Sequence, residues 1–345
     1  MEELNAISNS SIFRRTRPGA EFSQAPLRFI DIGAAGGVHP RMLPVASITH
    51  CLCFEPDPAA FGALTGTDSS PFAGMTVHNT IVGARDGRAD FFLTRNGVTS
   101  SLLRPGTHIR DRYGKTGLNI KETVNLPVRT LDSIVAGINS QIDYQAEIIK
   151  LDCQGAEYEI IEASPEAFGT QCMSVWCEVE FYPIYENQKT FSDIDPLLRS
   201  KGFVLYGLTP KYISRRMLDR KEYETNERAL WADAIYFRDP LDETNSGLDF
   251  TKRQIDVLIM CAAITGFFDL AAEIVSECVE GDEERKRLLE FVRHCAARKR
   301  RRVENDAKRF IDTCQKNPHN SYLIAKKFVD NNKDNNDVDF LAIEY

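Results

Sequence analysis

The sequence lacks a hydrophobic run long enough to cross a bilayer. Its longest apolar stretch, residues 257–268, is bounded by Asp256 and Asp269. It falls short of the ~20 residues that a spanning helix needs, so it predicts a buried helix. The N-terminal arginines are followed by Pro18 and no apolar segment comes after them, so no signal peptide is indicated. We therefore expect a cytoplasmic protein without a transmembrane segment.

Cysteine pairs of the kind that hold metals or form disulfide frameworks are also missing. The nine cysteines include no C-x-x-C motif, and no His or Cys partners stand at zinc-ligand spacing. Cys51 and Cys53 alternate within a predicted strand, which is typical of packing residues. The sequence indicates reduced thiols and no zinc site.

Positive charge is in deficit. The formal net charge is −8 and the isoelectric point is near 5.4, which argues against a nucleic-acid partner because such surfaces reward clustered Lys and Arg. The basic run at residues 299–302 is interpreted as a solvated helix face, with a local binding patch as the less favoured alternative.

Between residues 27 and 237, short β-branched or apolar runs alternate with helical stretches. This pattern predicts an α/β, doubly wound, mostly parallel sheet with helices on both faces. Asp86-Gly87 indicates a hairpin with a type I′ turn, inserted after the third strand. Residues 94–122 are polar and Gly-rich, which predicts a long loop acting as a lid or binding segment. The expected strands are 28–32, 49–54, 75–80, 147–151, 174–179, 203–207 and 231–237.

Past residue 240 the pattern becomes helical. We therefore expect an N-terminal extension at 1–26, a catalytic α/β domain at 27–240 and a C-terminal helical domain at 241–345. Gly266 separates two of the expected helices. Three roles for this helical domain stay open: acceptor selection, a homo-oligomer contact and docking on a carrier.

The first strand ends in a glycine loop, Phe29-Ile30-Asp31-Ile32-Gly33-Ala34-Ala35-Gly36-Gly37. Such a loop brings a ligand close to bare backbone at the crevice of an α/β sheet. A dinucleotide fingerprint would need glycine at 35 and 38, where Ala35 and Val38 stand. Asp31 would repel a pyrophosphate but can meet the cationic amino-acid part of S-adenosylmethionine. We expect Asp31, Gly33, Ala35 and Gly37 to bind this cofactor.

Two further positions complete the expected cofactor site. Glu55 ends the second strand about 20 residues after the glycine loop, where a carboxylate can accept hydrogen bonds from both ribose hydroxyls. Asn79 ends the third strand, where its amide can meet the adenine; turn chemistry is an equal alternative.

At this point the chain resembles the FkbM methyltransferases. The resemblance covers about residues 27–237 and implies the Rossmann-like class I methyltransferase fold, with an antiparallel last strand. It also implies S-adenosylmethionine as methyl donor and O-methylation of a sugar, glycolipid or natural product. The motifs that carry it, in matching order, are 29–37, Phe54-Glu55-Pro56, Asn79 with Gly83 and Gly87, Thr99-Ser100-Ser101-Leu102, Val128-Arg129-Thr130-Leu131-Asp132 and 149–157.

One position departs from the family pattern. The fourth-strand motif of the family commonly reads Asp-x-Glu-Gly, whereas Gln154 stands here in place of the Glu. A charge is lost if that acid positions a substrate or metal. If that acid only caps the following helix, Gln154 can serve nearly as well as a glutamate.

The acceptor proton needs a base near the carboxyl ends of the fourth and fifth strands. Asp152, Glu178 and Glu180 are the main candidates, with His39 beside the glycine loop; Glu157 and His108 are further ones. Glu178 and Glu180 share one strand face, where like charges raise a pKa. If a metal is needed at all, Asp152, Glu178 and Glu180 would hold Mg²⁺.

Three functions remain in competition. The first is an S-adenosylmethionine-dependent O-methyltransferase acting on a small-molecule, glycan or lipid-linked acceptor. The second is a nicotinamide-dependent oxidoreductase on a similar sheet, which Ala35 and Val38 disfavour. The third is a non-catalytic binding or scaffold protein, for which Gln154 is the support.

Overall fold

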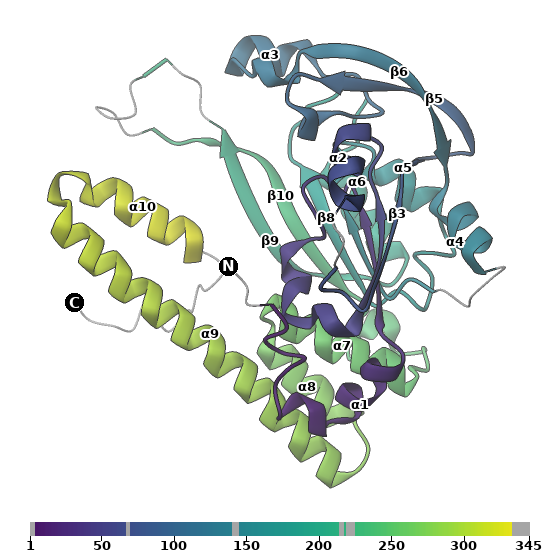
Figure 1. Cartoon of the computed structure of the whole chain (residues 1–345), viewed down its shortest axis with the longest axis vertical. Coiled ribbons are helices and arrows are strands. Elements are labelled where there is room, and N and C mark those ends of the chain that lie inside the picture. Colours follow the sequence, from purple (N-terminus) through teal and green to yellow (C-terminus); the bar gives the residue numbers. More distant parts are fainter. Residues whose placement is uncertain (1–3, 67–69, 140–144, 214–216, 219–224, 333–345) are drawn as a thin grey trace.

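A computed structural model of the chain describes residues 4–66, 70–139, 145–213, 217–218 and 225–332. The ends of the expected N-terminal extension and helical domain, 1–3 and 333–345, lie outside the described residues. Within the described part, no helix is long and apolar enough to span a membrane. Figure 1 shows a twisted central sheet with helices on both sides and a long helical hairpin extending from one end.

The central sheet has seven strands in the order β3-β2-β1-β7-β8-β10-β9. All the strand pairs from β3 to β8 are parallel, and β10 runs antiparallel to both of its neighbours. The expected doubly wound fold with an antiparallel last strand is therefore confirmed. The strands are β1 (Leu27–Ile32), β2 (Thr49–Phe54), β3 (Gly74–His78), β7 (Ile148–Leu151), β8 (Ser174–Glu180), β9 (Val204–Ile213) and β10 (Arg228–Phe237).

The predicted hairpin around Asp86-Gly87 is wrong. Ile81–Val82 (β4) and Gly87–Thr94 (β5) do not pair with each other, because Ile120–Arg129 (β6) lies between them in a second sheet of order β4-β6-β5. The Asp86 carboxylate instead accepts a hydrogen bond from the backbone N–H of Thr130, at 2.8 Å. The turn signal was local, whereas the strand that separates β4 from β5 comes from far along the chain.

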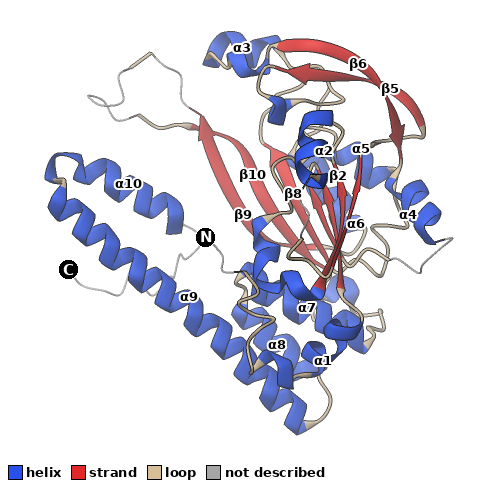
Figure 2. Ribbon diagram, viewed as in Figure 1, coloured by secondary structure: helices blue, strands red, loops and turns tan. Residues whose placement is uncertain are grey.

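The segment expected to be one long loop is largely ordered structure. Residues 94–122 contain the short 3₁₀ helices η3 (Gly97–Thr99) and η4 (Thr116–Leu118), the helix α3 (Thr107–Tyr113) and the start of β6. The small sheet and α3 lie above the same end of the central sheet, as Figure 2 shows. This layer covers the carboxyl ends of the parallel strands.

Two sets of helices cover the two faces of the central sheet. One face packs on α4 (Leu131–Asn139), α5 (Glu157–Glu162) and α6 (Phe191–Ser200). The other packs on the N-terminal segment, on the 3₁₀ helix η2 (Pro40–Ile48) and on the C-terminal helices. The remaining helices are η1 (Phe13–Arg15), α1 (Arg17–Gln24), α2 (Pro58–Thr65), η5 (Glu243–Asn245), α7 (Lys252–Thr265), α8 (Phe268–Cys278), α9 (Asp282–Lys316), η6 (Pro318–Asn320) and α10 (Ser321–Asn332).

The first C-terminal helix, α7, is part of the main core. Thr251 and Gln254 form a capping box at its start, and Gly266, with φ +93°, ends it in the left-handed conformation. Residues 254–264 are all buried, as the apolar run predicts, and Ile255 and residues 257–264 share one hydrophobic cluster with Phe29 and Trp176 of the sheet. The division into domains near residue 240 stays a prediction.

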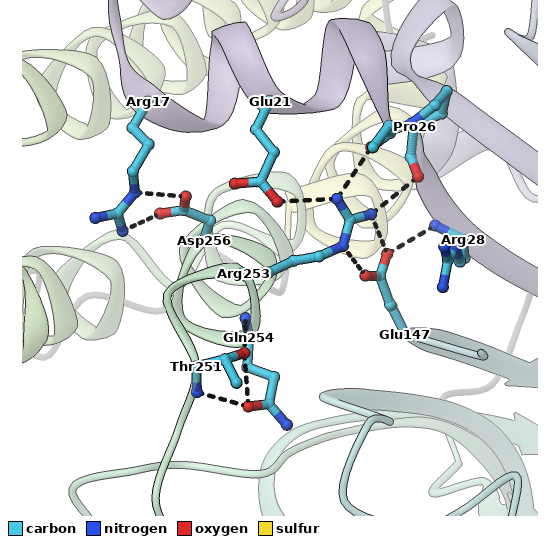
Figure 3. Close-up of polar contacts among 10 residues, drawn as sticks. Arg17, Glu21, Pro26, Arg28, Glu147, Thr251, Arg253, Gln254 and Asp256 are labelled. Atoms are coloured by element: carbon cyan, nitrogen blue, oxygen red, sulfur yellow. Dashed lines mark hydrogen bonds and ion pairs between the residues drawn. The ribbon is translucent and has the colours of Figure 1, made fainter. Parts of the chain in front are cut away.

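Ion pairs join α1 and α7 to the amino end of the sheet (Figure 3). Arg253 donates to Glu21 and Glu147 and to the carbonyls of Ala25 and Pro26. Arg17 and Asp256 form a second, bidentate pair at 2.7 and 2.8 Å. Each carboxylate in this group faces a guanidinium, which offsets the cost of burying it.

Candidate functional site

The loops after β1, β2 and β7 meet closely at the carboxyl end of the sheet. The backbone N–H groups of Gly33 and Ala34 donate to the carbonyl of Phe54, at 3.1 and 3.2 Å. Gly33 has φ +80°, and a Cβ added there would lie 2.0 Å from the carbonyl oxygen of Asp152. Only glycine fits this position, which explains the first glycine of the loop.

Asp31 lies beneath this loop and does not line the cavity described below. Its side chain is fully buried; Oδ2 accepts a hydrogen bond from the backbone N–H of His39 at 2.9 Å, and Oδ1 lies 3.1 Å from Lys150 Nζ. Burial raises the pKa of Asp31, and the Lys150 charge opposes that shift. The observed contacts of Asp31 hold the glycine loop in place.

Lys150 is a central residue that sequence reasoning did not single out. Its ammonium group donates to the carbonyl of Gly33 at 2.8 Å and lies near Asp31 and, at 3.7 Å, Asp152. These carboxylates raise its pKa although burial opposes the shift. The available signal was a lysine inside the otherwise apolar strand β7, since a charge buried in a parallel sheet needs partners.

A cavity of about 300 Å³ opens beside the glycine loop. Among the expected cofactor residues Gly33, Ala35 and Glu55 line it, whereas Asp31, Gly37 and Asn79 do not. Its apolar wall is formed by Ile32, Phe54, Ile81, Val82, Phe91, Val98, Leu102 and Ala156, and further polar lining comes from Asp57, Thr80, Ser100, Asp152 and Gln154. A mostly apolar cavity with a few polar groups in its lining is typical of small-molecule and cofactor sites.

Glu55, which is 4% exposed, is held in the lining of this cavity by its neighbours. One carboxylate oxygen accepts a hydrogen bond from the backbone N–H of Asp57 at 2.8 Å, and burial raises the pKa of Glu55. The amide of Asn79 donates to the carbonyls of Glu55 and Pro56, at 2.9 and 3.2 Å. These contacts favour turn chemistry over adenine binding for Asn79.

Gln154 connects a carboxylate that follows β7 with one on β8. Its side-chain amide donates to Asp152 Oδ1 at 2.8 Å and to Glu178 Oε2 at 3.0 Å. Its carbonyl oxygen accepts a hydrogen bond from the hydroxyl of Tyr185 at 2.9 Å. A glutamate in its place would add a third carboxylate to this cluster, whereas the amide supplies two donors. Gln154 thus lacks the charge of the family's glutamate, but its amide donates hydrogen bonds to both neighbouring carboxylates.

The other acidic candidates differ in what surrounds them. Both oxygens of Glu157 accept backbone hydrogen bonds, from Cys153 at 2.6 Å and Gly155 at 2.9 Å, so this residue shapes the loop after β7. Burial and the charge of Asp152 raise the pKa of Glu178 well above its usual value. Burial raises the pKa of Glu180 to about 7. Of the acidic candidates, Asp152 lines the cavity.

The two histidine candidates lie outside the cavity lining. The His39 ring accepts a hydrogen bond from the backbone N–H of Arg41 and packs edge-on against Trp176, and burial lowers its pKa to about 4. His39 is therefore neutral near pH 7. His108 is exposed on α3 and packs against Tyr182.

Part of segment 94–122 lines the cavity, and its role as a lid or binding segment stays a prediction. Gly97, Val98, Ser100 and Leu102 line it, and the Ser101 hydroxyl donates to the backbone carbonyl of Gln154 at 2.7 Å. The Thr99 to Leu102 motif thus connects the small sheet to the loop after β7.

Among the residues that the structure describes, no three His, Cys, Asp or Glu side chains are placed to hold a metal ion. Asp152, Glu178 and Glu180, the candidate Mg²⁺ ligands, are instead engaged differently: Gln154 bridges the first two, and Glu180 is buried.

Comparison with known proteins identifies the family of the chain. Residues 31–205, half of the chain, match the family model described as the methyltransferase FkbM domain. No curated protein matches the chain. Two solved structures are similar: a protein named as an RNA methyltransferase from Pyrococcus horikoshii (10% identity, 68% of this chain and 92% of that chain, TM-score 0.26), and the complex of the Haloferax volcanii Trm112 methyltransferase activator with a methyltransferase (11%, 69% and 98%, TM-score 0.29).

Proposed function

Because the chain belongs to the FkbM methyltransferase family, we propose that it methylates a hydroxyl group of a sugar, glycolipid or natural product, with S-adenosylmethionine as methyl donor. S-adenosylmethionine supplies a methyl group on a sulfonium, which is already activated for displacement. The protein then has to position the two substrates in line and to accept the hydroxyl proton.

The observation that carries this proposal is the cavity at the ends of β1, β2 and β7. Its apolar wall fits an adenine, and the Glu55 carboxylate in its lining fits the two ribose hydroxyls. We assign the amino-acid part of the cofactor to the adjacent glycine loop, which is open at Gly36 and Gly37: a Cβ added at either would meet nothing within 4 Å. Lys150, 10% exposed in its side chain, lies behind that loop with Asp31.

Asp152 is the residue we assign as proton acceptor. It lines the cavity, its side chain is 39% exposed, and it is oriented by Gln154 on one side and Lys150 on the other. Glu178 lies on the far side of the Gln154 amide, where it supports Asp152 through that bridge. A base oriented by two neighbours can act on a hydroxyl with little reorganisation.

Family membership favours this function over a nicotinamide-dependent oxidoreductase, and the glycine loop agrees because it lacks the dinucleotide pattern. A scaffold protein would keep the fold without the chemistry. The Gln154 network argues against it, since the amide keeps Asp152 oriented toward the cavity.

The test is calorimetric titration with S-adenosylhomocysteine beside NADH, followed by an acceptor screen with labelled methyl donor. We expect saturable binding of S-adenosylhomocysteine that Glu55→Ala weakens by about 10-fold or more, because two ribose hydrogen bonds are lost. Glu122→Ala, a change of an exposed residue on β6, is the matched control and should bind normally. Binding of NADH without binding of S-adenosylhomocysteine would instead support a nicotinamide-dependent oxidoreductase. Binding of neither ligand would favour a non-catalytic scaffold protein.

A further inference from the structure

A helical hairpin, formed by residues 300–332 of α9 and α10, extends away from the body of the protein (Figure 1). The buried residues of α9 are Leu288, Phe291, Val292 and Cys295, all in its first half. Beyond them, α9 packs against α10, with the rings of Phe310 and Phe328 stacked at 4.8 Å. The hairpin therefore presents most of its surface to the surroundings.

Apolar side chains lie on the outside of this hairpin. Tyr322, Leu323 and Val329 of α10 are 57%, 56% and 60% exposed, and Ile311 of α9 is 53% exposed. Tyr322 and Val329 share one helix face with Lys326, since they are four and three residues from it. Several large apolar residues exposed on one short helix indicate a contact surface.

The same surface is basic on an acidic protein. Residues 300–332 contain eight Lys and Arg against four Asp and Glu, whereas the whole chain carries −8. Three of those acids pair with bases of α9 itself. The exposed bases outside these pairs include Arg301, Arg302, Lys308, Lys326 and Lys327. The charge of the hairpin is thus opposite in sign to that of the whole chain.

We propose that this hairpin docks the protein on an anionic lipid surface. Lys326 and Lys327 lie beside Tyr322, Leu323 and Val329 on α10, so bases can meet lipid phosphates while the apolar side chains enter the headgroup boundary. A nucleic acid would satisfy the bases but leave these apolar side chains in water. The combination of both kinds of side chain favours lipid.

Docking of this kind would bring the α/β body to a surface that carries lipid-linked acceptors. The inference does not rest on the proposed methyl transfer, because it uses only residues of the hairpin. It extends the interpretation of residues 299–302 as a solvated helix face: the basic run continues into a mixed basic and apolar surface.

The experiment is sedimentation of the full chain with vesicles of phosphatidylcholine alone or with about one quarter phosphatidylserine. We expect binding to the anionic vesicles only, weakened as salt rises from about 0.1 to about 0.5 M. The double variant Lys326→Glu/Lys327→Glu should lower the affinity by about 10-fold or more, because each base near the surface contributes roughly fivefold. Tyr322→Ser/Leu323→Ser should lower it by a similar factor.

The matched control is Lys115→Glu/Lys121→Glu, which reverses two exposed charges near the small sheet and should bind like the unchanged protein. All these positions are exposed, so circular dichroism should show unaltered folding. Equal binding to neutral vesicles, no binding to either kind, or an equal loss in the control would overturn the proposal. So would tighter binding of a nucleic-acid duplex, or a self-association that the Tyr322→Ser/Leu323→Ser variant abolishes.

Discussion

The two ends of the central sheet both bury charged groups, but they balance them differently. At the amino end, Glu147 and Asp256 each face an arginine, Arg253 and Arg17 (Figure 3). At the carboxyl end, Lys150 contacts Asp31 and Asp152, while the carboxylates of Glu157, Glu178 and Glu180 lie nearby. Burial raises the pKa of all three, and the charge of Glu180 adds to the shifts of Glu157 and Glu178. One end is close to neutral and the other has an excess of acid.

This difference distinguishes charged groups that stabilise the fold from charged groups at the candidate site. A buried charge with a partner in good geometry costs little, and it joins α1 and α7 to the sheet. Unbalanced buried carboxylates cost stability, and groups with strongly shifted pKa values cluster at functional sites. We therefore expect changes at the carboxyl end to alter activity, and changes at the amino end to alter stability alone.

The largest expected effect tests the acidic end. Asp152→Asn should lower kcat for methyl transfer by about 1,000-fold, because the proton acceptor is removed while the shape is kept. Affinity for S-adenosylhomocysteine should change less than about threefold. Steady-state kinetics and calorimetry measure the two quantities. Asp90→Asn, on β5, is the control, and a kcat near that of the unchanged protein in Asp152→Asn would refute the assignment.

The next effect concerns the cation that balances Asp31. Lys150→Met should lower the free energy of unfolding by about 3 kcal/mol, because Asp31 stays buried without its partner. Urea unfolding measures this. The double variant Asp31→Asn/Lys150→Met removes both charges and should recover much of the loss. If the double variant is as unstable as the single one, the ion pair is not the cause.

A smaller effect is expected at the balanced end. Arg253→Met should lower the free energy of unfolding by about 2 kcal/mol, since Glu147 loses its charged partner. Binding of S-adenosylhomocysteine should not change. Lys252→Met is the neighbouring control: Lys252 and Glu280 are 69% and 82% exposed, so losing their ion pair should have no measurable effect. Weakened cofactor binding in Arg253→Met would contradict the expectation that changes at the amino end alter stability alone.

An effect of similar size is expected as a pH dependence. Burial raises the pKa of Glu180 from 4.5 to about 7, so in this window the folded protein holds a proton that the unfolded chain has released. The free energy of unfolding should therefore fall as the pH rises from 4.5 to 7, by about 2 kcal/mol relative to Glu180→Gln. Urea unfolding of both proteins at several pH values measures the difference. Parallel pH profiles would contradict the raised pKa.

Much of the fold followed from local patterns. Each of the seven predicted strands of the central sheet is present, with boundaries shifted by a few residues, because apolar runs between helical stretches are a strong signal. The prediction failed at β4 and β5. Asp86-Gly87 has the residues of a tight turn, but β6 pairs with both strands, and no local pattern reveals a partner that lies some 40 residues away.

Some residues of the candidate site were likewise predicted from the sequence, and others were not. Gly33, Glu55 and Asp152 were found from motif and position, and they line one cavity. Asn79 was placed at the right strand end, but its amide turned toward backbone carbonyls. Lys150 was inside a quoted motif without a role, since nothing in its neighbours along the chain shows the three oxygens around its ammonium group.

The sequence by itself determined the family, the alternation of strands and helices, and the residue types at the strand ends, because these depend on neighbours and periodicity along the chain. Only the tertiary structure decided which carboxylates stay buried, which are bridged by Gln154, and which line the cavity. It also decided that the basic run continues into an exposed apolar hairpin. The physical reason is that charge balance and burial are set by groups that meet across space, far apart in the chain.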